Sequence, residues 1–221
     1  MSMGPGWAYT TPYLEQLFVD TYGFEYKPRA GDVVVDIGAG LGEEVIVVAQ
    51  LVGQMGKVYA LEANPTTFAG LQFMCEQNKF AWVRALHEAI YNSDTKVTIE
   101  DDSENYLTNT INTSSAGYEV NAITLDSLVG REGITRIDFM KVNIEGAEQF
   151  LIEGMNKSVG MIHHMCISCH DFRHAYHNHG EFYMTKAKVL AFLHQHGFVT
   201  TMRNTGNRVV DDYIYAHKVQ L

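Results

Sequence analysis

Histidines gather in one short segment of this sequence, with acidic residues beside them. Four fall within ten positions: His170, His174, His177 and His179. Asp171 and Glu181 lie nearby. A histidine titrates near neutral pH, so a histidine with a carboxylate partner can remove the proton of a hydroxyl group. His170 comes first after a predicted strand, and we predict that it acts as general base with Asp171 at its side.

The same segment has two other interpretations. The first is a divalent metal site that binds a hydroxyl group and acidifies it. His170 and His174 would share one face if the segment were helical, and further donors are Cys166, Cys169 and Asp171. The second is a polar loop that covers a substrate without catalytic histidines. The sequence alone leaves the metal open.

A glycine-rich loop is the most informative part of the chain. Gly38, Gly40 and Gly42 separate the run VVVDI at 33–37 from a helical pattern. Glycines at such a place permit positive φ angles and the close approach of a ligand. Dinucleotide-binding enzymes and methyltransferases share this arrangement, but a dinucleotide needs its pyrophosphate at the helix N-terminus.

Acidic residues around the loop favour a cationic ligand over an anionic one. Asp36 precedes the glycines, and Glu43 and Glu44 follow them directly. These carboxylates would repel a phosphate but suit S-adenosylmethionine, which carries an ammonium and a sulfonium group. Glu62 ends the next predicted strand, where a carboxylate can accept hydrogen bonds from both ribose hydroxyls. Helix capping is the competing role for Glu62.

The elements that must position these residues alternate between strands and helices. Core strands are predicted at 33–37, 57–62, 136–144 and 161–168, and the segment 82–90 is predicted to contain another. Helices are predicted at 13–22, 43–53, 64–78, 125–133, 145–155 and 185–197. Further strands are expected at 96–101 and 118–124, and FVTTMRN and YIYAHKV form a closing hairpin. The pattern predicts an α/β fold with a doubly wound, mostly parallel sheet, whose ligands bind at the carboxyl ends of the strands.

Length, charge and cysteine content limit the possible classes of protein. The 221 residues fit one domain at 27–221, preceded by an N-terminal arm and short helix at 1–26. A net charge of −10 disfavours nucleic acid as a partner. Three cysteines do not make a disulfide framework, and neither a signal peptide nor a membrane-spanning run is evident. We therefore expect a cytoplasmic protein without membrane contact, and a homo-oligomer is possible.

Several motifs resemble those of FkbM-like methyltransferases in order and spacing. They are DIGAGLGEE, KVYALEANPTTFAGLQ, EAIYNSD, ITLDSL and FMKVNIEGAEQFLIEGM. The resemblance implies a Rossmann-like methyltransferase sheet and O-methylation of a hydroxyl on a sugar or other small metabolite. It places the methionine end of the cofactor at Asp36, Gly38 and Gly40, the ribose at Glu62 with Ala63 and Asn64 alongside, and the adenine at His87, Glu88 and Ala89. Asn143, Glu145 and Glu148 would lie near the methyl group.

One departure from the family pattern affects the catalytic prediction. The family usually has Asp where this chain has Asn143, and an amide cannot act as a base. If that Asp carries chemistry in relatives, Glu145 or a histidine must replace it here. A non-catalytic protein that only binds the cofactor is the alternative that Asn143 supports, and an NAD-type oxidoreductase is the weaker one.

The aromatic N-terminal arm has two possible roles. It contains Trp7, Tyr9, Tyr13, Phe18 and Tyr22. They could cover the ligand cleft as a lid, or they could form a dimer contact.

Overall fold

A seven-stranded sheet forms the centre of the molecule. The structure is a computed structural model that describes residues 11–99, 111–112, 117–177 and 180–219. The strand order is β10-β11-β9-β8-β1-β2-β3. The strands are β1 Val33–Ile37, β2 Lys57–Leu61, β3 Val83–Leu86, β8 Ile137–Val142, β9 Ile162–Ser168, β10 Phe198–Thr201 and β11 Tyr213–Lys218. The pairs among β1, β2, β3, β8 and β9 are parallel, whereas β11 is antiparallel to β9 and β10. This order confirms the predicted fold class and the closing hairpin.

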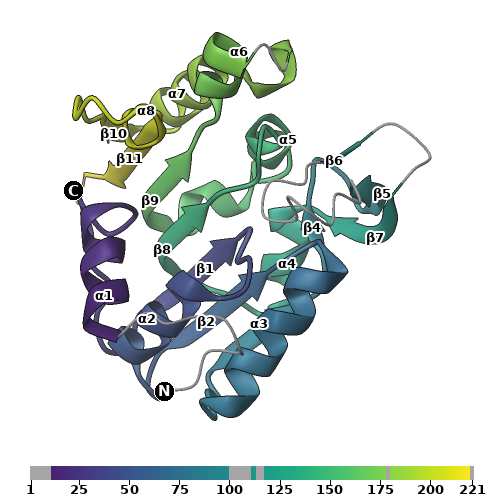
Figure 1. Ribbon diagram of the computed structural model, residues 1–221, viewed down its shortest axis with the longest axis vertical. Coiled ribbons are helices and arrows are strands. Elements are labelled where there is room, and N and C mark those ends of the chain that lie inside the picture. The colour runs from purple at the N-terminus through teal and green to yellow at the C-terminus, as the bar shows by residue number, and fades with distance from the viewer. Residues whose placement is uncertain (1–10, 100–110, 113–116, 178–179, 220–221) are drawn as a thin grey trace.

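Helices cover both faces of this sheet (Figure 1). They are α1 Thr11–Asp20, α2 Glu43–Val52, α3 Pro65–Gln77, α4 Leu125–Glu132, α5 Glu148–Glu153, α6 Asp171–His177, α7 Lys186–Gln195 and α8 Arg208–Asp211. Alternate side chains of β1 enter two separate cores. Val34 packs with α1, α2 and α3, whereas Val35 and Ile37 pack with α4, α5 and α7. A strand buried on both faces requires the continuous apolar run seen in VVVDI.

A second, four-stranded sheet lies beside the main one (Figure 1). Its strands are β4 Ala89–Ile90, β5 Thr95–Ile99, β6 Ile111–Asn112 and β7 Tyr118–Ile123. The segment 82–90, predicted to contain a strand, provides β3 of the main sheet and also β4 of the small one. The predicted strands at 96–101 and 118–124 are β5 and β7, which pair with each other in antiparallel register.

The first helix is part of the domain core. Leu14, Phe18 and Tyr22 are buried in the same apolar cluster as α2. The ring of Tyr22 stacks on that of Tyr213 with 5.1 Å between centroids. The division of the chain at 26/27 stays a prediction, and Trp7 and Tyr9 lie outside the described residues.

Two local predictions need correction. The helix expected at 145–155 begins only at Glu148, because Glu145 and Gly146 have φ angles of 54° and 95° that an α-helix cannot contain. The segment at 168–183, expected as a loop in one interpretation, contains α6 and the 3-10 turn η3 Glu181–Tyr183.

Within the described ranges, no helix has the length and apolar character needed to cross a bilayer.

Candidate cofactor and active site

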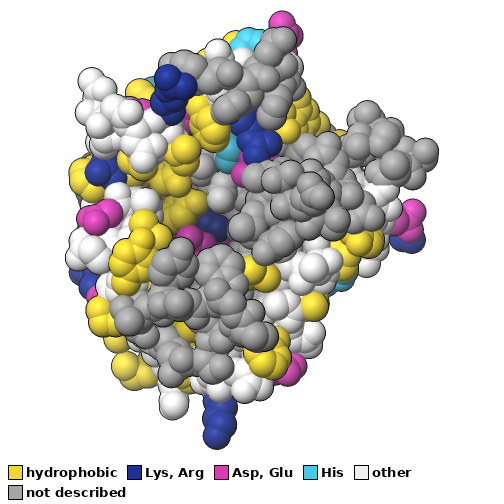
Figure 2. Space-filling model, viewed as in Figure 1, with side chains coloured by type: hydrophobic (Ala, Val, Ile, Leu, Met, Phe, Trp, Pro, Cys, Tyr) yellow, Lys and Arg dark blue, Asp and Glu magenta, His cyan; other side chains and the backbone are white. Residues whose placement is uncertain are grey.

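A cavity of about 370 Å³ opens at the carboxyl edge of the parallel strands. The loops after β1, β2 and β8 line it, together with α1 and the small sheet. In Figure 2, charged side chains of both signs are visible at the bottom of a hollow, next to hydrophobic side chains. The predicted residues that line this cavity are Gly38, Gly40, Glu43, Glu62, Ala63, Asn64, Glu88, Ala89, Asn143 and Glu145. These ten are among the 23 residues that line the cavity.

The glycine loop is shaped by a close backbone contact. Gly38 has a φ of 78°, and a Cβ at this position would lie 1.9 Å from the carbonyl oxygen of Asn143. Only glycine fits between β1 and β8 here. The Gly38 amide donates to the Leu61 carbonyl (3.0 Å) and its carbonyl accepts from Lys141 Nζ (2.7 Å), so three strands hold the loop.

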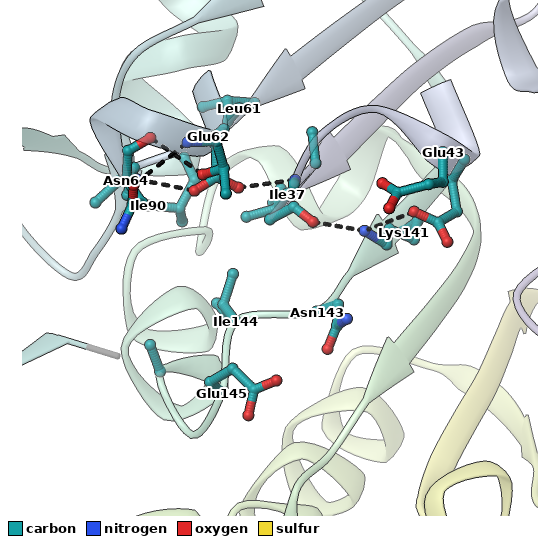
Figure 3. Close-up of a pocket in the computed structure, with 18 of the residues that line it drawn as sticks. Ile37, Glu43, Leu61, Glu62, Asn64, Ile90, Lys141, Asn143, Ile144 and Glu145 are labelled. Carbon is teal, nitrogen blue, oxygen red and sulfur yellow. Dashed lines mark hydrogen bonds and ion pairs between the residues drawn. The ribbon is translucent and has the colours of Figure 1, made fainter. Parts of the chain in front are cut away.

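Glu62 connects the glycine loop to the start of α3. One of its carboxylate oxygens accepts the Gly40 amide (2.8 Å), and the other accepts the Asn64 amide (2.8 Å). The Asn64 side chain in turn accepts the Thr66 amide and caps α3 (2.8 Å). Each oxygen of a carboxylate has two lone pairs, so Glu62 can still accept hydrogen bonds from a ligand. The capping and ligand-binding roles are compatible in this geometry (Figure 3).

A buried cation supports the floor of the cavity, and sequence reasoning missed it. Lys141 Nζ lies 2.9 Å from Asp36 Oδ1 and 3.9 Å from Glu44 Oε2. Burial by itself lowers the pKa of Lys141, but Asp36 and Glu44 keep that pKa above its ordinary value. A lysine inside the apolar run IDFMKV of β8 was the available signal, because a buried charge needs a partner.

Asp36 accordingly has a different position from the one predicted. It is 1% exposed and paired with Lys141, and it is not among the residues that line the cavity. Glu43 and Glu44 do line it. Burial raises the pKa of Glu44 to about 7. Glu43, Glu44 and the Asp36 beneath them are three acidic groups next to one cation, Lys141. The cavity therefore has a surplus of acidic groups.

The three residues predicted to bracket an adenine divide into two groups. Glu88 and Ala89 line the cavity, and Arg131 binds the Glu88 carboxylate through two hydrogen bonds of 2.7 Å. His87 does not line it. Its ring is exposed, stacks on Phe68 at 4.8 Å and lies 3.1 Å from the Ala63 carbonyl oxygen. Ile90 and Ile99 supply apolar wall beside Ala89.

His170 is enclosed by carboxylates. Its Nδ1 lies 3.0 Å from Glu148 Oε1 and its Nε2 lies 3.3 Å from Glu145 Oε1. Burial alone lowers the pKa of His170, but hydrogen bonds to Glu145 and Glu148 outweigh it and raise that pKa to about 10. At neutral pH the ring therefore holds its proton, a state that does not favour the predicted role as general base.

Glu145 places its carboxylate at the cavity from a strained turn. A φ of 54° is unusual for a residue with a side chain and costs about 1–2 kcal/mol. Arg173 Nε binds its second oxygen at 3.0 Å. Figure 3 shows Glu145 and Asn143 on the side of the cavity opposite Glu62. Asn143 Oδ1 is buried and has no hydrogen-bond partner within the described part of the chain.

Asp171 is engaged elsewhere. Its Oδ2 accepts the amides of Thr185 and Lys186, both at 3.0 Å, and so satisfies the first turn of α7. Asp171 does not line the cavity, so the structure brings Glu145 and His170 together without it.

The proposed metal ligands do not converge. Cys166 and Cys169 are buried in the two different apolar cores on opposite faces of the sheet, and burial raises the pKa of both thiols. Both nitrogens of His170 face carboxylates. Across the described residues, no group of three or more His, Cys, Asp or Glu side chains is arranged to hold a metal ion.

The first helix closes one side of the cavity. Tyr13, Leu14 and Leu17 line it, although Tyr13 and Leu17 are about half exposed. Of the aromatic residues named for a lid or a dimer contact, Tyr13 lines the cavity, whereas Phe18 and Tyr22 are buried in the core. Residue periodicity predicted the helix but gave no sign of its contact with the cavity.

Comparisons with known proteins agree with this geometry. The family model described as the methyltransferase FkbM domain matches residues 36–200. No curated protein matches the chain. Among solved structures, the methyltransferase FkbM from Methylobacillus flagellatus KT aligns with 92% of this chain at 12% identity and a TM-score of 0.61. The alignment covers 50% of that protein, so this chain spans about half its length.

Two further structures share the fold. Aeropyrum pernix fibrillarin, in complex with natively bound S-adenosyl-L-methionine, aligns with 89% of this chain and 70% of its own, with 11% identity and a TM-score of 0.52. A SAM-dependent methyltransferase from Aquifex aeolicus aligns with 95% of this chain and 97% of its own, with 12% identity and a TM-score of 0.51. Because the matched family domain covers most of the sequence, this chain belongs to the FkbM methyltransferase family.

Proposed function

We propose that the chain binds S-adenosylmethionine in the 370 Å³ cavity and transfers its methyl group to a hydroxyl of a small molecule. The observation that carries the proposal is the cavity itself: a glycine loop fixed by Glu62, with Glu43 and Glu44 exposed to the ligand. Family membership supports the same reaction class. The volume lies within the range of about 300–1,000 Å³ that is usual for small-molecule sites.

The residues present fit this cofactor. Gly38 and Gly40 line the cavity, and the acidic pair Glu43 and Glu44 suits a cationic amino group. Glu62 would accept hydrogen bonds from the ribose, while Ala89 and Ile90 would contact the adenine. When bound, the cofactor supplies a methyl group on a sulfonium, which a nucleophile attacks. The protein's own residues bind the cofactor, orient the acceptor and limit its contact with water.

The acceptor hydroxyl is proposed to lie beside Glu145 and Asn143. Both line the cavity, and their side-chain oxygens can accept the hydroxyl proton in a hydrogen bond. This assignment moves the contact with the acceptor from His170 to Glu145, because His170 is protonated and buried. A sugar or another neutral metabolite remains the proposed substrate class.

The acidic character of the protein supports a small acceptor. A net charge of −10 and the carboxylates around the cavity disfavour an RNA substrate. A cytoplasmic location, the lack of membrane contact and a homo-oligomeric state stay predictions.

Methyl transfer tests the proposal directly. Tritiated S-adenosylmethionine is incubated with methyl α-D-glucopyranoside or catechol, as probes of the sugar and phenol classes, with and without Mg²⁺. Tritium found in either probe supports methyltransferase activity. A Glu145→Gln variant should transfer tritium to the probe about tenfold more slowly, or slower still. Binding of S-adenosylhomocysteine without transfer to any hydroxyl would instead favour the non-catalytic alternative that Asn143 suggested.

A further inference from the structure

The group formed by Glu145, Glu148, His170 and Arg173 goes beyond what binding the cofactor requires. Glu148 and His170 are buried, and neither lines the cavity. Glu145 lines it, and the other three lie behind or beside its carboxylate. The arrangement links a cavity residue to the buried ends of β9 and α5.

Both nitrogens of His170 face carboxylate oxygens, which fixes the state of the ring. A neutral imidazole has one N–H, so its second nitrogen would direct a lone pair at a carboxylate. Donation to Glu145 and Glu148 at once requires the imidazolium, in agreement with the raised pKa. The charges then balance, with two carboxylates, one imidazolium and the Arg173 guanidinium.

Glu148 is the fixed end of this group. It is fully buried, and its Oε2 accepts the hydroxyl of Thr185 at 3.0 Å. Its Oε1 accepts the Gly146 amide at 3.2 Å as well as His170 Nδ1. Gly146 cannot be replaced easily, because a Cβ there would lie 2.5 Å from the Phe182 ring. Glu148 therefore holds both the imidazolium and the backbone of the strained turn.

Other charged groups near His170 are already paired on neighbouring elements. Asp171 binds the first amides of α7, and Lys186 of α7 pairs with Asp212. Arg173 binds Glu145 through Nε, and its guanidinium lies 5.2 Å above the Tyr183 ring. The contacts that orient the Glu145 carboxylate thus come from His170 on one oxygen and Arg173 on the other.

We propose that His170 is a positioning residue, an imidazolium held by Glu148 that keeps the Glu145 carboxylate against the acceptor hydroxyl. This inference rests on the proposed function. Strain in the Glu145 backbone would otherwise relax and turn the carboxylate away from the cavity. The ring does not touch the reacting atoms, so its loss should lower kcat while cofactor affinity stays unchanged.

The first test measures the state of the ring without any turnover. Histidine-labelled protein is titrated by NMR, and the His170 resonance is assigned by its loss in His170→Gln. We expect the His170 ring of the wild type to be an imidazolium at pH 8. In a Glu148→Gln variant, the same ring should lose its proton at a lower pH. A His170 ring that is neutral at pH 8 in the wild type overturns the inference.

The second test separates positioning from a general effect on folding. In His170→Gln, kcat for the methylated probe should fall about tenfold or more while the Kd of S-adenosylhomocysteine changes by less than about twofold. His170→Lys restores a cation and should recover part of the rate, and the exposed His163→Gln serves as the matched control. Unchanged kcat in folded His170→Gln contradicts the inference. Failure of the wild type to bind S-adenosylhomocysteine would instead reject the proposed function.

Discussion

At the scale of single residues, buried charge explains why the predicted roles shifted. Asp36 was expected to meet the methionine end of the cofactor, yet it holds Lys141 beneath the cavity. His170 was expected to be a base, yet two carboxylates keep it protonated. In both cases the sequence identified a chemically active residue, but the partner that decides its role lies far away in the sequence. The partner is 105 positions away for Asp36 and 22 positions away for His170.

Removal of the buried cation should destabilise the protein strongly. In Lys141→Met, Asp36 and Glu44 lose their shared partner, and an uncompensated buried charge costs about 3–5 kcal/mol. Urea unfolding measures the change in the free energy of unfolding. The exposed Lys157→Met is the control and should change it by less than about 0.5 kcal/mol. Equal effects of the two substitutions would show that the Asp36–Lys141 pair does not support the cavity floor.

At the scale of elements, regular segments were predictable and the irregular ones were not. Apolar runs identified the five parallel strands, and the Asn64–Pro65 pair identified the start of α3. The turn before α5 was missed because Glu145 is held there by contacts with His170 and with Arg173 of α6, and no local pattern encodes such contacts. Similarly, the segment 82–90 was predicted to contain one strand, and the second strand that it provides, which joins the small sheet, was not predicted.

Helix α1 provides the test at this scale. If it covers the bound cofactor, Leu17→Ser should weaken binding of S-adenosylhomocysteine by about threefold to tenfold, because apolar surface is lost from the cavity wall. The melting temperature should stay nearly constant, since Leu17 is about half exposed. Binding is measured by calorimetry. The control is Met55→Ser, because the Met55 side chain is more exposed than that of Leu17. Unchanged affinity in Leu17→Ser would remove α1 from the cofactor site.

At the scale of the whole molecule, the group around His170 links stability to pH. The folded protein binds the His170 proton with a pKa of about 10, against an ordinary value of 6.5. The stabilisation is therefore complete below pH 6.5, decreases as the pH rises and is lost above about pH 10. Unfolding in urea at several pH values should show a decline between pH 7 and 9 that is shallower in His170→Gln. Parallel declines in both proteins would contradict a raised pKa.

The charge of the whole chain also determines which ligands the cavity accepts. A protein with a net charge of −10 and an acidic cavity should attract a cation and repel a diphosphate. This property separates the methyltransferase from the NAD-type oxidoreductase, whose glycine loop has a similar spacing. It depends on Glu43, Glu44 and Glu62 together, so it can be measured on the intact protein.

Calorimetric titration with S-adenosylhomocysteine and with NAD shows which of the two ligands the cavity binds. We expect saturable binding of S-adenosylhomocysteine, no binding of NAD, and at least about tenfold weaker binding of S-adenosylhomocysteine in Glu62→Gln, with the exposed Glu76→Gln as control. Saturable binding of NAD, with no heat from S-adenosylhomocysteine, would instead identify the cavity as a dinucleotide site.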